Sequence, residues 1–370
     1  MINKRKVISL LKNSIGVSTN RKLVSFYVDD WGSVRTRDLK ALEYLKHKGI
    51  DVDKNRFTRF DSLESETDLC ALFDILHSVK DKNRNSACFT AVMNPCNPNF
   101  EAIRSNRFTE FISEPFTDTL NKYGYYKVFN LWKQGIDDNI FFPMFHGTEH
   151  VSRSHLMKAL QMDNKPDVWA FECDSVGVPG TMSGTMEPYC IEQKKDNETL
   201  AGNINDGLYV FEKIFGFRAR QFRAGGDNIS PELYPALKAC GIEYMDETMY
   251  IYRHLGDGKY KRCFAYTGKV NHTGQKLIVR NCVFEPSNCK TLDPVMNCLL
   301  MIDIAFKCHK PAIISSHRVD YVGSLDINNR KQGLMKLSQL LKEIVNRYPD
   351  VEFVNADQMA DILYLQHGNA

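Results

Sequence analysis

Segments with the apolar character of strands alternate with segments of helical periodicity along most of this 370-residue chain. Strands separated by helices pair in parallel, because each helix carries the chain back to the edge of the sheet from which it started. At least six such units follow one another, which favours an α/β fold with a closed or nearly closed (β/α) barrel, distorted and seven- or eight-stranded, over an open doubly wound sheet. The predicted strands are 23–28, 87–93, 140–145, 167–172, 220–224, 242–246, two within 260–285, 312–317 and 351–355.

Helices are predicted between these strands. We expect an N-terminal extension (1–20) followed by a single barrel domain (21–365) with insertions at about 49–139 and 174–197. The second insertion has the glycines and prolines of a long loop or lid. The predicted helices are 36–48, 66–79, 152–161, 198–215, 230–240, 293–307 and 328–347.

The composition excludes several classes of protein. The net charge is +3 and charges of both signs are interspersed, so no basic stripe indicates nucleic acid or an anionic membrane as partner. No apolar window has the length of a membrane span, and the apolar stretch after the basic N-terminus is too short for a signal-peptide core. The eleven cysteines are scattered without a Cys-x-x-Cys pair, which indicates reduced thiols. We therefore expect a cytoplasmic protein of unknown oligomeric state.

Two histidines, His146 and His150, follow the predicted strand 140–145. Imidazoles four residues apart can bind one metal ion, but a catalytic metal usually has three protein ligands and one position for water. The strand 23–28 ends in Asp29-Asp30, and such carboxylates serve water, a helix cap or a metal, because burying an unpaired carboxylate is costly. The pattern predicts a divalent metal site, with zinc as first choice. A loop carboxylate and hydrogen-bonded histidines stay open as alternatives.

The segment 146–150 also matches H-x-x-E-H, the pattern of inverted zincin metallopeptidases, in which both histidines lie on one helix. Pro143 and Gly147 flank His146, and the residues before it have strand character. A helix is therefore not expected here, which makes a metallopeptidase the weaker hypothesis.

Several predicted strands end in polar groups that can carry chemistry. In a (β/α) barrel the C-terminal ends of the strands meet at one face, and active sites lie there. A histidine in such a place is a candidate general acid with a pKa near neutral pH. These groups are Asp29 with Asp30, His146 with His150, Arg223, Asp246 and His317.

Taken in order, these motifs resemble those of the polysaccharide deacetylase family, carbohydrate esterase family four, whose members share the chitooligosaccharide deacetylase homology domain. The family's first motif, a strand ending in two aspartates, is similar to residues 28–32, and its second, two histidines four apart, is similar to 146–150, with glycine in place of the usual hydroxyl residue. The third motif resembles 222–226, where two glycines replace a proline-aromatic pair. The fourth and fifth contain Asp246 and His317.

The resemblance implies a metal held by three side chains and a general base beside it. Asp30, His146 and His150 would be the metal ligands. Asp29 would be the base, and Arg223 would orient it and tune its pKa.

The resemblance also implies the groups that act on the substrate. His317 would be the acid that protonates the leaving amine, and Asp246 would hold and charge-stabilise it. The backbone N–H of Gly226 would stabilise the oxyanion, and Trp31 would lie at the substrate.

We therefore predict a metal-dependent carbohydrate deacetylase, a hydrolase that removes acetyl (N-acyl) groups by attack of a metal-activated water on a linear amide. One alternative is a catalytically inactive protein of this fold that binds carbohydrate or acts as an assembly partner in surface polysaccharide metabolism. Another is a metal-independent amidohydrolase on the same scaffold. The sequence does not indicate the sugar, nor whether an N-acyl or an O-acyl group is removed.

Overall fold

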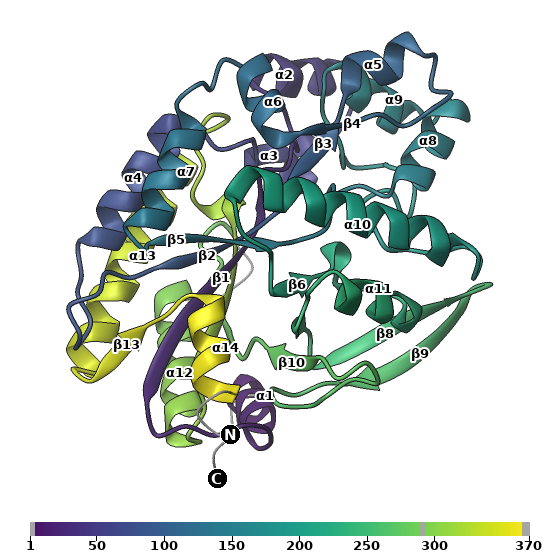
Figure 1. Cartoon of the computed structure of the whole chain (residues 1–370). Coiled ribbons are helices and arrows are strands. Elements are labelled where there is room, and N and C mark those ends of the chain that lie inside the picture. Colours follow the sequence, from purple (N-terminus) through teal and green to yellow (C-terminus); the bar gives the residue numbers. More distant parts are fainter. Residues whose placement is uncertain (1–3, 289–292, 365–370) are drawn as a thin grey trace.

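The computed structural model describes residues 4–288 and 293–364 and is built around one nine-stranded sheet (Figure 1). Every ladder in this sheet is parallel, as the alternation of strands and helices predicts. The strand order is β10-β7-β6-β5-β2-β1-β12-β11, with β13 beside the first residues of β1. The strands are β1 (Lys22–Trp31), β2 (Phe89–Met93), β5 (Phe141–Phe145), β6 (Gln221–Arg223), β7 (Tyr244–Glu247), β10 (Lys276–Val279), β11 (Cys282–Val283), β12 (Ala312–His317) and β13 (Val351–Phe353).

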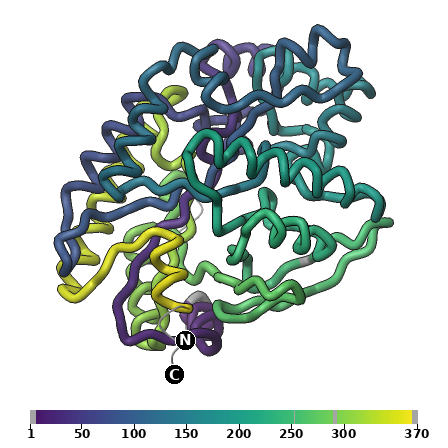
Figure 2. The backbone as a smooth tube through the Cα atoms, in the orientation of Figure 1, coloured from purple at the N-terminus to yellow at the C-terminus, as the bar shows by residue number. Residues whose placement is uncertain are grey.

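Helices cover the outside of the sheet, and the tube in Figure 2 shows the chain passing repeatedly from strand to helix. Along one side α7, α4, α13 and α12 contact one another in that order. Their apolar residues form the main core with one face of the strands, including Val24, Phe26 and Val28 of β1. The helices are α1 (Lys4–Asn13), α2 (Leu39–His47), α3 (Arg56–Phe60), α4 (Glu66–His77), α5 (Phe100–Ser105), α6 (Phe116–Lys122), α7 (Val128–Asp137), α8 (Arg153–Gln161), α9 (Lys165–Glu172), α10 (Asp196–Phe215), α11 (Tyr234–Ala239), α12 (Pro294–Lys307), α13 (Ile327–Arg347) and α14 (Ala356–Tyr364).

One predicted strand is a helix. Residues 167–172 lie in α9, which has a proline, Pro166, in its first turn and Asp167 beside it. Proline fits the first turn of a helix, and an acidic residue there is favoured by the helix dipole. The buried residues Asp167, Ala170 and Phe171 have helical spacing, so the prediction of a strand was wrong because a short apolar run was given the wrong period.

Two small antiparallel sheets lie outside the main sheet. One pairs β3 (Cys96–Pro98) with β4 (Ser113–Pro115), and the other is the hairpin of β8 (Tyr250–Gly256) and β9 (Lys259–Phe264). In Figure 1 this hairpin extends past α11 at the right of the molecule. Two strands were predicted within 260–285, whereas that region holds most of β9 and all of β10 and β11.

The two edge strands of the main sheet are neighbours in the chain. The edge strands β10 and β11 are consecutive in the chain and are joined by only two residues, Arg280 and Asn281. No pairing links β10 to β11 within the described residues. The architecture is therefore a mixed α/β fold with a barrel-like parallel sheet, in which eight strands follow one path and β13 pairs with β1 beside them.

The N-terminal residues belong to the same compact body. Helix α1 packs against α12, and the side chain of Asn281 donates a hydrogen bond to Asn13 at 2.7 Å. The segment 49–139 supplies α4, β2 and α7 to the wall of the fold. The division into an extension and a domain with insertions stays a prediction. Among the helices of residues 4–288 and 293–364, none combines the length and the apolar character needed to cross a membrane.

Candidate metal centre

A bulge at the end of β1 sets the position of the two adjacent aspartates. Val28 pairs with Ala91 of β2, but Trp31 pairs with Met93, so β1 holds one extra residue over this interval. Asp30 lies in this bulge and has a φ of +79°, in the left-handed region. In a regular strand, neighbouring side chains point to opposite faces. The bulge re-aims the side chains, and both Asp29 and Asp30 reach partners at the C-terminal end of the sheet.

Trp31 does not belong to this group. Its indole is 1% exposed and packs edge-on against Trp132 and Phe141 in the main core. A side chain in that position cannot contact a substrate, so the structure places Trp31 in the core rather than at the site.

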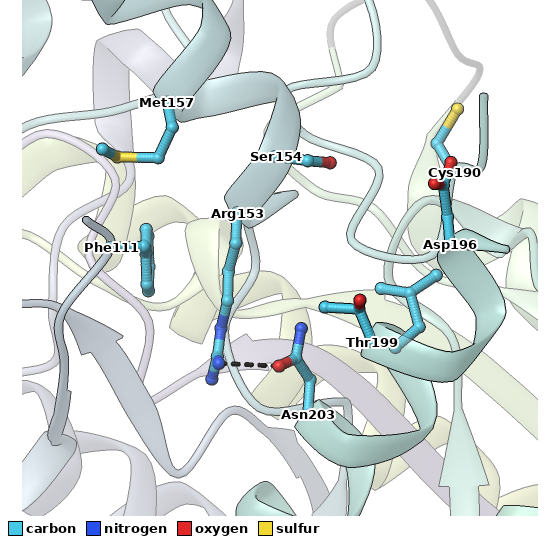
Figure 3. Close-up of a pocket in the computed structure, with 9 residues that line it drawn as sticks. Phe111, Arg153, Ser154, Met157, Cys190, Asp196, Thr199 and Asn203 are labelled. Atoms are coloured by element: carbon cyan, nitrogen blue, oxygen red, sulfur yellow. Dashed lines mark hydrogen bonds between the residues drawn. The ribbon is translucent and has the colours of Figure 1, made fainter. Parts of the chain in front are cut away.

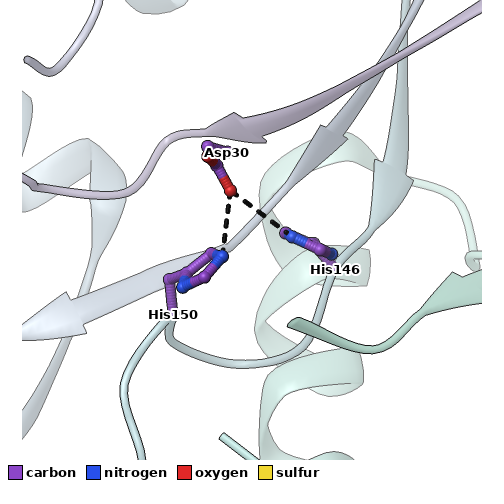
Figure 4. A group of neighbouring side chains, drawn as sticks. All are labelled: Asp30, His146 and His150. Carbon is purple, nitrogen blue, oxygen red and sulfur yellow. Dashed lines mark ion pairs between the residues drawn. The ribbon is translucent and has the colours of Figure 1, made fainter. Parts of the chain in front are cut away.

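Asp30, His146 and His150 converge on one point (Figure 4). Oδ1 of Asp30 lies 2.9 Å from Nε2 of His150 and 3.6 Å from Nε2 of His146. Zinc ligands at about 2.0–2.2 Å in a tetrahedron are separated by about 3.3–3.6 Å. The distance to His146 lies within this range and the distance to His150 is shorter than it. The three side chains are only 2%, 3% and 8% exposed. The donor set of two nitrogens and one carboxylate oxygen is that of a catalytic metal with one open position.

A hydrogen bond at the second ring nitrogen of His146 also fits a metal site. Nδ1 of His146 lies 3.0 Å from the carbonyl oxygen of Arg223. Metal-binding histidines usually donate the second ring N–H to such an acceptor, which leaves the other nitrogen free to bind the ion. The loop itself is held by the side-chain amide of Asn94, which donates to the carbonyls of His146 and Gly147 at 3.3 and 3.0 Å.

The structure does not have the arrangement of an inverted zincin. Residues 146–150 form a loop between β5 and α8, not a helix, and Gly147 has a φ of +102°. The carboxylate of Glu149 pairs with Arg153 at 2.8 Å and also accepts from Ser113. The carboxylate of Glu149 is therefore occupied by these two partners. This agrees with the expectation that a metallopeptidase is the weaker hypothesis.

Asp29 is held by two arginines. Nη1 and Nη2 of Arg280 lie 2.7 and 2.6 Å from its two carboxylate oxygens, and Nε of Arg223 lies 3.4 Å away. Burial alone would raise the pKa of Asp29, but Arg280 and Arg223 lower it to about 2. The carboxylate is therefore ionised at neutral pH and has a fixed orientation.

Asp246 and His317 are not joined as expected. The carboxylate of Asp246 binds Arg280 at 2.6 Å and Arg223 at 3.3 Å, and its described contacts do not include His317. Nδ1 of His317 instead lies 2.6 Å from Oε1 of Glu285, which also pairs with Arg56. The expectation that Asp246 holds His317 is corrected: Asp246 balances the charge of the arginines, and Glu285 takes its place beside the histidine.

His317 faces the base across the site. Its Nε2 lies 3.8 Å from Oδ2 of Asp29. Burial alone would lower the pKa of His317, but the charge of Glu285 and the hydrogen bond to it raise the pKa to about 9. The imidazole is therefore protonated at neutral pH and can donate a proton from Nε2.

Arg280 and Glu285 were missed by the sequence analysis. Each follows a short apolar strand, β10 or β11, and so obeys the same strand-end rule as the residues that were found. The signal was present in the sequence, but the strands of 260–285 were not located, so their ends were not known.

A loop covers the metal ligands. We call residues 174–197 the covering loop; a Cβ atom on Gly225 would lie 3.0 Å from Pro188 of this loop and 3.6 Å from Nε2 of His150. A Cβ atom on Gly147 would lie 2.5 Å from the hydroxyl of Tyr189. The covering loop therefore rests directly on the histidine loop and on the turn after β6. Gly226, with a φ of +71°, occupies that turn.

The opposite side of the site is more open. The side chain of His317 is 27% exposed. Arg56, which pairs with Glu285, lines a cavity of about 540 Å³ together with Arg59 and Phe60. This side gives solvent access to His317.

Neither a protein-family model nor a curated protein sequence matches this chain. Solved structures do resemble it. A probable polysaccharide deacetylase from Pseudomonas aeruginosa PAO1 is 9% identical with a TM-score of 0.48, and a putative polysaccharide deacetylase from Mycobacterium smegmatis is 14% identical with a TM-score of 0.45; in both, 95% of this chain and 94% of the other are covered. The 4-alpha-glucanotransferase of Thermococcus litoralis is 10% identical with a TM-score of 0.46, and 94% of this chain spans 41% of its length. At these scores and identities the likenesses assign no activity, and the function has to be inferred from the site.

Proposed function

We propose that this protein is a metal-dependent hydrolase of the polysaccharide deacetylase type, which removes N-acyl groups from a carbohydrate. The observation that carries the proposal is the convergence of Asp30, His146 and His150, whose ligand atoms all lie within 4.8 Å of one another. Zinc is the ion that we propose, because two imidazoles and one carboxylate suit it, although the same donors also accept iron, cobalt, nickel or manganese.

The three ligands would hold the ion, which when bound lowers the pKa of a water to about 7 and polarises the acyl carbonyl. Asp29 precedes the ligand Asp30 in the chain and is ionised, and we assign to it the proton of the attacking water. Its orientation comes from Arg280, which contacts both of its oxygens. Held in this way, the carboxylate does not need to reorganise during the reaction.

His317 acts on the leaving group. With its raised pKa it is protonated at neutral pH and donates the Nε2 proton to the amine nitrogen as the C–N bond breaks. Oδ2 of the base and Nε2 of the acid lie 3.8 Å apart, which is close enough for one tetrahedral intermediate to contact both. The backbone N–H of Gly226 is the proposed donor to the oxyanion. Loss of such a donor typically costs about 10²–10³-fold in rate.

The test combines metal analysis with an assay. The purified chain should contain zinc, chelation should remove it, and the metal-loaded protein should release acetate from a panel of N-acetylated oligosaccharides. His146→Ala should hold about one zinc per molecule fewer than the unchanged chain and should lose the activity. If His146→Ala holds as much zinc as the unchanged chain, the proposal fails. Activity that survives complete chelation would indicate a metal-independent amidohydrolase, and a stable metal-free protein without turnover would indicate a carbohydrate-binding role.

A further inference from the structure

A second group of metal-ligating side chains lies where the covering loop meets the β8–β9 hairpin. Sγ of Cys190 is 3.7 Å from Nδ1 of His254, and Oε2 of Glu187 is 3.7 Å from Nε2 of the same ring. One ligand atom from each of the three residues lies within 4.8 Å of the other two. His254 belongs to β8, whereas Glu187 and Cys190 belong to the loop.

The chemistry of this group differs from that of the first centre. A thiolate, an imidazole and a carboxylate form a donor set that zinc and related borderline cations accept. For Zn–S of about 2.3 Å and Zn–N of about 2.0–2.1 Å, a tetrahedral site separates sulfur from nitrogen by about 3.6 Å, close to the distance found between Cys190 and His254. The sulfur and Nδ1 of His254 are therefore already spaced for one ion, and an oxygen of Glu187 lies within 4.8 Å of both ligand atoms.

We propose that Glu187, Cys190 and His254 bind a second divalent cation of the zinc class, with water as the fourth ligand, and that this ion fastens the covering loop to the hairpin. The site would be structural, because its three ligands join two segments that lie far apart in the chain. The proposal is independent of the proposed activity.

The surroundings already bring the two segments together. The backbone N–H of Asp257, at the tip of the hairpin, donates to the carbonyl of Glu192 in the loop at 2.8 Å. A Cβ atom on Gly256 would lie 3.0 Å from the backbone nitrogen of Lys194. An ion would therefore add a bond to an existing contact and would not have to draw distant segments together.

The position of the three residues gives the ion a role. Pro188 and Tyr189, which cover the first centre, lie between Glu187 and Cys190 in the chain. Fixing both ends of this short segment would fix the part of the loop that rests on His150 and Gly147. The second ion would thereby keep the first centre covered.

Cys190 is accessible to an ion from solvent. It is among the residues that line a cavity of about 340 Å³ between α8 and α10 (Figure 3). The walls of this cavity also include Ser154 and Met157 of α8 and Thr199 of α10.

Cobalt substitution separates the two centres. Co²⁺ bound to a thiolate has a ligand-to-metal charge-transfer band in the near ultraviolet, and the Asp30, His146, His150 set contains no sulfur. We would titrate Co²⁺ into the metal-free full chain that carries His146→Ala. The band should rise and saturate at one equivalent. It should be absent after the further change Cys190→Ser and unaltered after Cys263→Ser, a matched change on the neighbouring strand β9.

Two further measurements complete the test. One examines His254, and the other uses the chain without any substitution. His254→Gln should weaken Co²⁺ binding by roughly tenfold or more, since even outer-shell changes at metal sites cost about 10–100-fold. In the chain with no substitution, Zn²⁺ should slow alkylation of Cys190 by N-ethylmaleimide at least tenfold, as mapped by peptide mass spectrometry, without slowing that of exposed Cys70.

The proposal is overturned by any of three results. These are the absence of a thiolate band at saturating Co²⁺, a band that Cys263→Ser removes as fully as Cys190→Ser, or equal alkylation of Cys190 with and without Zn²⁺. Because the titration uses a chain whose first centre is disabled, its failure would leave the proposed deacetylase function untouched. Far-ultraviolet circular dichroism of each metal-free variant shows whether it is folded.

Discussion

Oε1 of Glu285 lies 2.6 Å from Nδ1 of His317 and holds the imidazole with its other nitrogen toward Asp29. The carboxylate comes from just beyond β11, and the histidine ends β12, the strand that pairs with β11. Two neighbouring strand ends thus supply both members of the pair. Asp246, which the sequence suggested for this task, lies across the sheet on β7 and binds arginines instead.

Replacing the base should separate metal binding from turnover. Asp29→Asn removes the proton acceptor but none of the three metal ligands, so we expect the same zinc content as in the unchanged chain and a fall in kcat of about 10²–10⁴-fold. Metal analysis and acetate release on the same sample measure the two effects. The matched control is Asp227→Asn, which should stay active. The side chain of Asp227 also contacts Arg223 but is 52% exposed. Full activity in Asp29→Asn would contradict the assignment of the base.

Replacing Glu285, the partner of His317, should shift the pH dependence of kcat/KM. A general acid works below its pKa, and the pKa of His317 is raised to about 9, so kcat/KM should fall as the pH rises through about 9. In Glu285→Gln the charge that raises this pKa is gone, while burial still lowers it. The alkaline limb should therefore shift to lower pH. Glu192→Gln, which changes an exposed carboxylate, should leave the limb in place, and an unmoved limb in Glu285→Gln would contradict the pairing.

The same pair gives a stability prediction with a defined sign. Because the folded-state pKa of His317 lies above its ordinary value of 6.5, its contribution to stability is fully present below about 6.5 and is lost as the pH rises through about 9. Urea unfolding at a series of pH values should show this alkaline loss. In Glu285→Gln the loss should be smaller. A loss of equal size in both proteins would show that other groups cause it.

Introducing a hydroxyl residue at position 147 should destabilise this chain. Gly147→Ser would place a side chain at a φ of +102° and against the hydroxyl of Tyr189. The expected loss in the free energy of unfolding is about 1–3 kcal/mol, measured by denaturant unfolding. Gly202→Ser is the control, because that glycine lies in α10 with nothing within 4 Å of its Cβ position. The control should be neutral or slightly more stable.

The residue after the acid should be a strong determinant of stability. Arg318 is fully buried and binds Asp61 at 3.0 Å and Glu64 at 3.0 Å. Arg318→Leu would leave two buried carboxylates without their partner, and we expect a loss of about 3–5 kcal/mol in chemical unfolding. Arg218→Leu removes a 70% exposed arginine that pairs with Glu212 and should cost less than about 1 kcal/mol. Equal losses in the two variants would contradict this account.

Much of the fold could be predicted from the sequence, because the order of strands and helices determines a parallel sheet. Closure and strand number could not, since they depend on how β10 and β11, strands of four and two residues, meet across Arg280 and Asn281. Such short strands carry too few side chains to show a period. The segment 167–172, predicted as a strand, belongs to α9. This error has the same cause, because a short apolar run does not show a clear period.

The candidate site, too, could be predicted only in part from the sequence. Asp29 and Asp30 were expected at one place because their strand ends there, but regular strand geometry would have sent them to opposite faces. Only the bulge and the φ of Asp30 show how one carboxylate reaches the histidines while the other reaches Arg280. The tie between Glu285 and His317 depends on the pairing of β11 with β12, which the sequence does not reveal.

Arg280 stands at the two-residue join between the sheet edges and binds Asp29 of β1 and Asp246 of β7 from there. Asp29 is thus a counter-ion of the scaffold whether or not a reaction takes place. Under the proposed function, a descendant of this protein without turnover would still be stabilised by an acid in that position, which together with Asp246 balances the charge of the arginine. An aspartate there would therefore mark an intact sheet join, and Asp30 together with both histidines would be the better mark of the proposed hydrolase.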